Sequence, residues 1–233
     1  MMGGRGFFVV GTDTGVGKTR VAAALLRAYG RLRYRCVGMK PVAAGAELHD
    51  GVWVNEDVAQ LQAAGNVDAP LEQANPYLFR EAIAPHIAAD HKGVNIELPR
   101  IRAAYEALAR QAEVVVVEGA GGLLVPLSAS KDMADLAVVL NLPIVLVVGM
   151  RLGCLNHALL TSEAMSARGL RLAGWVANRI DPAMTAYDEN LLTLTKRLPG
   201  PLLVELPWNA DMEVDHAADL FSPKRLDGML STG

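Results

Sequence analysis

The sequence predicts an α/β protein in which a mostly parallel sheet lies between helices on both faces, as a single domain over residues 1–233. The chain length suits one large domain. Hydrophobic residues make up 52% of the chain and aromatic residues only 5%, so most apolar positions are Ala, Val or Leu. This profile suits strands that are buried on both faces. Strand-like and helix-like segments also alternate along the chain, which is the order that builds parallel sheets.

Six short, unbroken apolar segments, most of them rich in valine, are expected to form buried strands. They cover residues 7–10, 36–39, 114–117, 144–148, 174–177 and 202–205. Helical periodicity is present at residues 18–29, 98–111, 131–140, 155–168 and 187–198. The stretch from residue 43 to residue 95 is less regular, and we expect one helix near residues 57–64 and surface loops there. Loops at strand ends are where an open α/β sheet places its functional site.

The charge and the apolar segments disfavour several classes of protein. The formal net charge is −3 and no five like charges follow one another, which argues against general nucleic-acid binding. The apolar segment at residues 7–10 is too short for a signal sequence or a membrane span. The longest apolar stretch, residues 136–150, is interrupted by Asn141 and Pro143, so we interpret it as a helix end followed by a strand. Cys36 and Cys154 are the only cysteines, and we expect reduced thiols in a cytoplasmic protein that binds neither nucleic acid nor membrane.

The strongest motif is a glycine-rich segment, GTDTGVGKT, at residues 11–19. It directly follows an expected strand and opens an expected helix, which is the context of a phosphate-binding loop. The glycines let backbone N–H groups face phosphate, Lys18 adds a full positive charge, and Thr19 offers a hydroxyl to Mg²⁺. One departure places Thr12 where the first glycine is expected, with Gly11 one residue earlier. The alternative is a glycine-rich turn that binds nothing, but Gly-Lys-Thr in this context favours a nucleotide site and the P-loop NTPase fold.

Three further charged residues stand where they can serve a bound nucleotide. Glu118 follows the strand at residues 114–117, and the carboxyl ends of parallel strands share one edge, so Glu118 is either a metal ligand near the loop or a solvated acid. Asp57 is either a second such acid or the N-cap of a helix. Lys40 comes directly after the strand at residues 36–39, where it either faces the reacting centre or lies on the surface.

A series of motifs occurs in order over nearly the whole chain: GTDTGVGKT, GMKPVAAG, NPYLF…APH, VVVEGAGGLLVPL, RLGCLNHALLT, GWVANR and VELPW. In this combination the chain resembles the dethiobiotin synthetase family. The resemblance implies an ATP- and Mg²⁺-dependent ligase of biotin biosynthesis that acts on 7,8-diaminononanoate and CO₂. It implies that one substrate amine forms a carbamate and that the carbamate takes the γ-phosphate as a carbamic–phosphoric anhydride. The second amine then closes the cyclic urea of dethiobiotin, and ADP and phosphate are released.

The resemblance also implies roles for individual positions. The residues that would contact the carbamate or the transferring phosphoryl group are Thr14, Lys18 and Lys40. The Mg²⁺ ligands would be Thr19, Asp57 and Glu118, which favours Asp57 as a ligand over a helix cap. Besides Lys18 and the metal ligands, the nucleotide phosphates would be bound by Gly15, Val16, Gly17, Arg20, Gly119, Ala120 and Gly121. The base pocket would consist of Asn178, Arg179, Pro207, Trp208 and Asn209.

The resemblance further implies a homodimer with shared active sites. The substrate carboxylate would bind at a helix N-terminus of the neighbouring subunit, formed by Gly153, Cys154, Leu155 and Asn156. Three positions depart from the family pattern. A loop glutamate common in the family is Gly15 here, a hydroxyl residue that often follows the Lys-Pro-Val-Ala stretch is Ala44, and a tyrosine near the substrate tail aligns with Asn190. We expect the nearby Tyr187 to substitute for that tyrosine.

The competing hypothesis is a partner-regulated ATPase switch of the chromosome- or septum-positioning type, like ParA and MinD. Such proteins usually carry a second lysine early in the phosphate loop, where this chain has Thr12 and Asp13. A membrane-targeting version would end in a basic amphipathic helix, whereas residues 215–233 carry only Lys224 and Arg225 as basic residues. A synthetase linked to an amidotransferase would need a glutaminase domain that 233 residues cannot supply. The enzyme is therefore favoured, while the preferred base stays open because the pocket segments carry no clear adenine-reading signature.

Overall fold

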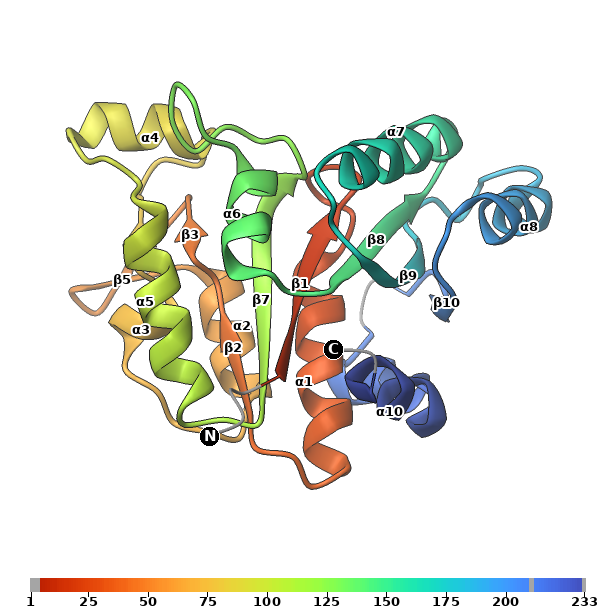
Figure 1. Ribbon diagram of the computed structural model, residues 1–233, viewed down its shortest axis with the longest axis horizontal. Coiled ribbons are helices and arrows are strands. Elements are labelled where there is room, and N and C mark those ends of the chain that lie inside the picture. Colours follow the sequence, from red (N-terminus) through yellow and green to blue (C-terminus); the bar gives the residue numbers. More distant parts are fainter. Residues whose placement is uncertain (1–4, 210–211, 232–233) are drawn as a thin grey trace.

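A parallel six-stranded sheet forms the centre of the computed structural model, which describes residues 5–209 and 212–231 (Figure 1). In spatial order its strands are β10 (Leu202–Leu206), β9 (Leu172–Arg179), β8 (Ile144–Met150), β1 (Arg5–Gly11), β7 (Val114–Gly122) and β2 (Cys36–Met39). Each neighbouring pair in this sheet is parallel. Because β1 lies between β7 and β8, the loop after β1 is near the middle of the carboxyl edge, where open α/β sheets bind ligands.

Two small sheets flank this centre. β3 (Val42–Ala43) pairs in parallel with β6 (Tyr77–Leu78), and β4 (Glu47–His49) forms a hairpin with β5 (Val52–Val54). Both belong to the long connection between β2 and β7. They add an irregular layer beside the carboxyl end of β2.

Helices cover both faces of the sheet (Figure 1). The helices of one face are α1 (Lys18–Arg31), α2 (Glu56–Ala64), α9 (Val214–Asp219) and α10 (Pro223–Ser231). Those that pack into the core on the other face are α4 (Pro85–Lys92), α5 (Leu98–Ala109), α6 (Met133–Leu140), α7 (Cys154–Ala167) and α8 (Tyr187–Arg197). The short helix α3 (Leu71–Ala74) lies beside α5.

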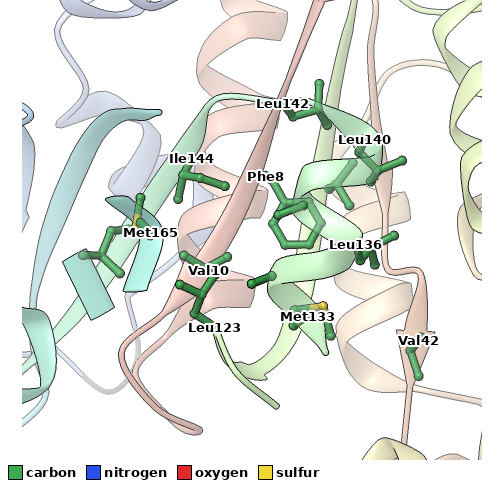
Figure 2. Close-up of a cluster of buried hydrophobic side chains, with 14 of the residues drawn as sticks. Phe8, Val10, Val42, Leu123, Met133, Leu136, Leu140, Leu142, Ile144 and Met165 are labelled. Carbon is green, nitrogen blue, oxygen red and sulfur yellow. The ribbon is translucent and has the colours of Figure 1, made fainter. Parts of the chain in front are cut away.

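Side chains of the central strand alternate between two hydrophobic clusters. Phe7 and Val9 belong to the cluster that contains α1. Phe8 and Val10 belong to the opposite cluster, and Figure 2 shows Phe8 next to Leu136 of α6. Burial on both faces removes the need for polar positions in the strand, which explains its unbroken apolar sequence.

The predicted fold class and all six predicted strands are confirmed. The largest difference is at β7, which continues past the valines to Gly122, so that Glu118 lies within the strand instead of after it. Gly122 pairs with Gly11 of β1. Strand pairing is made by backbone groups, and it therefore extends beyond the residues whose side chains are apolar.

Helix boundaries differ from the prediction where capping decides them. α6 begins at Met133, two residues later than expected, because Asp132 is its N-cap. The carboxylate of Asp132 accepts the N–H of Asp135 at 2.9 Å, and the Asp135 carboxylate accepts the N–H of Asp132 at 3.0 Å, which completes a capping box. α7 begins one residue earlier than expected, at Cys154. The interpretation of residues 136–150 as a helix end followed by a strand is confirmed, with Asn141 in the left-handed conformation as the C-cap.

Several short elements between residues 43 and 95, and the helices after β10, are not predicted from the sequence. These elements are α3, α4, α9, α10, β3, β4, β5 and β6. The C-terminal helices pack against α1, where the Tyr29 hydroxyl donates to the carbonyl oxygen of Leu226 at 3.0 Å and Arg31 pairs with Asp215 at 2.9 Å. Within the described residues, no helix has the length and apolar character required to cross a membrane. Residues 1–4, which precede the apolar segment judged too short for a signal sequence, lie outside the described part.

Candidate active site

The glycine-rich loop joins β1 to α1, as the sequence predicts, and it is held against the end of β8. The N–H of Thr12 donates to the carbonyl oxygen of Val147 at 3.0 Å. A Cβ atom on Gly11 would lie 2.6 Å from Val16 Cγ2 and 2.8 Å from the carbonyl oxygen of Asp13. The loop folds back onto Gly11, so residue 11 has no room for a side chain. This explains why a glycine stands there, one residue before the standard position.

Asn178 at the end of β9 fixes the other side of the loop. Its side-chain amide is buried and donates to the carbonyl oxygen of Val16 at 2.8 Å. Gly17 has a φ of 91°, and a Cβ atom there would overlap Asn178 Nδ2. Gly15 has a φ of 73° with no atom within 4 Å of the position of its Cβ. Both glycines therefore adopt the left-handed conformation, but only Gly17 is also confined by a neighbour.

This difference gives a matched pair of variants. Gly15→Ala should lower the free energy of unfolding by about 1 kcal/mol, the cost of a left-handed non-glycine residue. Gly17→Ala should lower it by about 3 kcal/mol, because the methyl group also displaces Asn178. Denaturant unfolding of the two variants measures the difference. Equal losses would mean that Asn178 does not constrain the loop.

Thr19, Asp57, Glu118 and Lys40 come together at the start of α1. The Thr19 hydroxyl lies 2.8 Å from Asp57 Oδ1 and 2.9 Å from Glu118 Oε1. Lys40 Nζ lies 2.7 Å from Asp57 Oδ2 and 2.6 Å from Glu118 Oε1. The helix cap of α2 is Asn55, whose side chain accepts the N–H of Val58, so the carboxylate of Asp57 is available for these contacts. The interpretation of Asp57 as a helix cap is therefore wrong, and Lys40 is not a surface lysine.

Because Lys40 and Glu118 are buried, the charges in this cluster interact strongly with one another. The side chains of Lys40 and Glu118 are 5% and 1% exposed. Burial alone would lower the pKa of Lys40, but Glu118 and Asp57 outweigh it and raise that pKa, so the side chain remains an ammonium. Burial raises the pKa of Glu118, and the ammonium of Lys40 opposes the change. For Asp57, burial acts upward, but Lys40 and the hydrogen bond from Thr19 lower the pKa below its ordinary value.

A second ammonium group lies nearby on the loop. Lys18 Nζ donates to the carbonyl oxygen of Asp13 at 3.0 Å. Burial, and then repulsion from Lys40, lowers the pKa of Lys18 to about 8. A phosphate group placed on the loop would favour the charged form again, because an anion stabilises a neighbouring ammonium. The site can therefore present two positive charges to an anionic ligand.

The oxygen atoms of this cluster fit a magnesium ion. One hydroxyl and two carboxylates from Thr19, Asp57 and Glu118 converge, and hard oxygen ligands of this kind suit Mg²⁺, which keeps further positions for water and phosphate. The second carboxylate oxygen of Glu118, Oε2, is buried without a hydrogen-bond partner, as expected of an atom that has a ligand to bind. Among the described residues, no group of three or more His, Cys, Asp and Glu side chains gathers as a metal site. A metal here would thus depend on Thr19 and on the ligand as well as on the two acids.

An open cleft of about 710 Å³ leads to this cluster. Thr14, Gly15, Lys18, Lys40 and Glu118 line its inner wall. The cleft is also lined by Ala82, Ile83, Ala84 and Pro85 at the start of α4, residues to which the sequence assigns no role. Two of these, Ala84 and Pro85, lie in the APH part of a family motif, so that motif was the signal that could have identified them.

The residues expected to form a base pocket lie near the loop, and none of them lines this cleft. Asn178 pairs in register with Leu206, so residues 207–209 leave β10 next to the end of β9. Arg20 of α1 donates to the carbonyl oxygen of Asn209 at 3.2 Å, which brings that segment to the start of the helix. Trp208 is exposed. Arg179 turns away, since its guanidinium lies 4.7 Å from the centre of the Tyr187 ring and donates to the carbonyl oxygen of Pro182.

The expected carboxylate site lies at the start of α7. Gly153 is the N-cap with a φ of 92°, and Cys154 is buried. Among the described residues that line the cleft, none comes from residues 153–156. Tyr187 is buried under Arg179 and likewise does not line the cleft, so this chain offers no support for Tyr187 as a substitute at the substrate tail. Ala44 and Gly15 do line it.

Comparison with known proteins identifies the family. A family model described as an AAA domain matches residues 5–215. The ATP-dependent dethiobiotin synthetase BioD of Aromatoleum aromaticum is 59% identical over 203 residues, which cover 87% of this chain and 90% of the relative. That of Nitrosospira multiformis is 51% identical over 228 residues, which cover 98% of this chain and 99% of the relative. The chain belongs to the dethiobiotin synthetase family.

Solved structures show how this synthetase fold relates to other P-loop proteins. A ParA family ATPase from Chlorobium tepidum superposes with a TM-score of 0.57 at 13% identity, covering 99% of both chains. The septum site-determining protein MinD from Pyrococcus horikoshii superposes with a TM-score of 0.56 at 16% identity, covering 95% of this chain and 93% of that one. At such identities the likeness shows the fold alone. The predicted family is confirmed, and with it the ligase class, while the resemblance to the switch proteins is confined to architecture.

Proposed function

We propose that this member of the dethiobiotin synthetase family closes the cyclic urea of dethiobiotin from 7,8-diaminononanoate and CO₂, with ATP converted to ADP and phosphate. The observation that carries the proposal is the cluster of Thr19, Asp57, Glu118 and Lys40 at the mouth of the phosphate loop. It combines oxygen ligands for a metal with a buried ammonium. A site that transfers a phosphoryl group to an anionic carbamate needs both.

The chemistry has three steps on the substrate. One amine of the diamine, in its neutral form, adds to CO₂ and loses a proton to solvent, which gives a carbamate. A carbamate oxygen attacks the γ-phosphate and displaces ADP, which gives a carbamic–phosphoric anhydride. The second amine, also neutral, attacks the carbonyl carbon of this anhydride, phosphate leaves, and the new ring nitrogen loses its proton to solvent. The first two steps bring a carbamate against a triphosphate, so positive charge close to both is required.

Lys18, Lys40 and Thr14 are the catalytic residues in this proposal. Lys18 would bind the outer phosphates from the loop, and Lys40 would face the carbamate and the transferring phosphoryl group from its position directly after β2. Thr14 lines the same cleft from the loop and would contact the same groups. The metal would be held by Thr19, Asp57 and Glu118, where it would neutralise phosphate charge. The arrangement favours charge neutralisation as the main contribution to rate, because no acid–base pair is needed to activate a carbamate oxygen.

The remaining assignments belong to the same proposal. Main-chain groups from Gly15 to Arg20 and from Gly119 to Gly121 would surround the phosphates, at the ends of two adjacent strands. The base would lie against Asn178 and the segment Pro207–Trp208–Asn209, with Arg179 at the margin. β9 and β10 are paired, so their carboxyl ends lie side by side. This supports a single base pocket formed by two segments that are far apart in the sequence.

The start of α7 would bind the substrate carboxylate of a second subunit, and the enzyme would be a homodimer with shared sites. Residues 153–156 do not line this chain's own cleft, so in this proposal they would serve the neighbouring subunit. The helix N-terminus offers N–H groups and a partial positive charge to a carboxylate. We also propose that residues 1–233 act as one domain in the cytoplasm, where the two free thiols remain reduced.

The proposal predicts phosphate release that depends on the diamine. Purified protein with Mg²⁺–ATP and bicarbonate should release phosphate only when 7,8-diaminononanoate is added, and dethiobiotin should appear in equal amount. Repeating the assay with all four nucleoside triphosphates would settle the preferred base. Phosphate release at the same rate without the diamine would contradict the proposed reaction and favour a simple ATPase.

A further inference from the structure

An ion pair joins the phosphate loop to the segment that leads into α7. Arg151 Nη2 lies 2.7 Å from Asp13 Oδ2, and the two side chains are 44% and 42% exposed. The other oxygen of this carboxylate, Oδ1, accepts the N–H of Thr14 at 2.7 Å. The carbonyl oxygen of Asp13 accepts the ammonium of Lys18 at 3.0 Å. Asp13 thus has three polar contacts, two within the loop and one to Arg151 after β8.

A carboxylate in a phosphate loop creates an electrostatic problem. The negative charge of Asp13 acts on Lys18, where it opposes the lowering of the lysine pKa by burial and by Lys40. The same charge would repel a triphosphate bound on the loop, since like charges that are only partly screened raise each other's energy. Something must neutralise Asp13 if the loop is to hold nucleotide well, and Arg151 is the cation in direct contact with it.

The backbone around Arg151 holds it in place. β8 ends one residue earlier, at Met150, and the N–H of Cys154 donates to the carbonyl oxygen of Arg151 at 3.0 Å. A Cβ atom on Gly149 would lie 2.8 Å from Val16 Cγ1, so the end of β8 packs tightly against the loop. The position of Arg151 relative to the loop is therefore set by the sheet and by the first turn of α7, and not by the ion pair alone.

We propose that Arg151 is a positioning residue that neutralises Asp13 and thereby lets the loop accept a nucleoside triphosphate. Asp13 orders the loop through its bonds to Thr14 and Lys18, and Arg151 cancels the charge that this ordering introduces. The inference rests on the proposed function in that its ligand is the triphosphate of that reaction. It also links the nucleotide loop to the start of α7, where the proposed carboxylate site begins.

The test is a double-variant cycle on nucleotide affinity. Binding of a fluorescent ATP analogue with Mg²⁺ is measured for the wild type, Arg151→Met, Asp13→Asn and the double variant. Arg151→Met should raise Kd about tenfold at low salt, with a smaller effect at high salt, because it exposes one uncompensated charge to the phosphates. The double variant should return to within about threefold of the wild type, because the harmful charge is then absent. Arg151→Lys should stay close to the wild type.

Matched controls separate this role from a structural one. Arg168→Met breaks another ion pair, at 2.8 Å to Asp132 at the start of α6, and should leave Kd unchanged. Thermal unfolding should give all variants the same midpoint within a few degrees. A Kd for Arg151→Met equal to that of the wild type would overturn the inference, as would a double variant that binds as weakly as Arg151→Met. Absence of diamine-dependent turnover in the wild type would instead contradict the proposed reaction and leave this comparison of affinities to decide the role of Arg151.

Discussion

Replacement of Lys18 by alanine is expected to abolish measurable turnover. Its ammonium is the positive charge on the phosphate loop itself, and it is largely buried at the inner wall of the cleft. A hydrogen bond to a charged partner contributes about 1.5–3 kcal/mol, so nucleotide affinity should fall roughly 10- to 100-fold. Loss of a charge that stabilises the transition state should lower turnover by about 10³-fold in addition. Calorimetric titration with Mg²⁺–ATP and phosphate-release kinetics measure the two effects.

The control for this variant is Lys196→Ala on α8, which removes an exposed lysine remote from the cleft. It should bind nucleotide and turn over like the wild type. Near-normal activity of Lys18→Ala would mean that the loop does not hold the transferring phosphate. A loss of activity shared by Lys18→Ala and Lys196→Ala would point to general charge effects instead.

The sheet could be predicted from the sequence because its strands are buried on both faces. Val114 to Val117 are all fully buried, and the same is true of Val145 to Val148. Such positions accept only apolar residues, so local composition carries the information. The prediction stopped short at Glu118 because strand pairing by backbone does not depend on side-chain type. It also missed α9 and α10. α9 has only six residues, too few to be stable alone, and it is held by packing against α1.

The candidate site was only partly predictable. The loop follows a strand and Glu118 follows a run of valines, and these local contexts indicate their role. The contacts that form the site join residues that are far apart in the sequence. Thr19 and Glu118 are 99 positions apart, and Lys40 and Glu118 are 78 positions apart. The pair of Arg151 and Asp13 spans 138 positions. Spacing in one sequence does not report such contacts, because they depend on how the strands are ordered in the sheet.

Replacement of Lys40 by alanine should damage the reaction far more than nucleotide binding. Lys40 directly follows β2 and contacts the metal-ligand cluster from there, whereas the phosphates would lie on the loop. We expect turnover to fall by about 10²–10³-fold, the usual effect of removing one group that stabilises a developing charge. The KM for ATP should change by less than about threefold. Equal losses in turnover and in ATP affinity would mean that Lys40 only clamps the nucleotide.

A second effect of this variant concerns folding. Lys40→Ala leaves the buried carboxylate of Glu118 without its ammonium partner, and breaking a buried pair from one side costs about 3–5 kcal/mol. Thermal unfolding in metal-free buffer should therefore show a lower midpoint than the wild type. The double variant Lys40→Met with Glu118→Gln removes both charges and should recover most of this stability.

The double variant separates stability from chemistry. If it folds as well as the wild type but turns over no faster than Lys40→Ala, its slow reaction comes from the missing ammonium and the missing metal ligand, and not from a loosened fold. If it recovers turnover together with stability, neither charge takes part in the reaction, and the cluster is a structural ion pair. Slow turnover and recovered turnover are opposite results for the same variant. Phosphate-release kinetics on the folded double variant therefore distinguish a catalytic cluster from a structural ion pair.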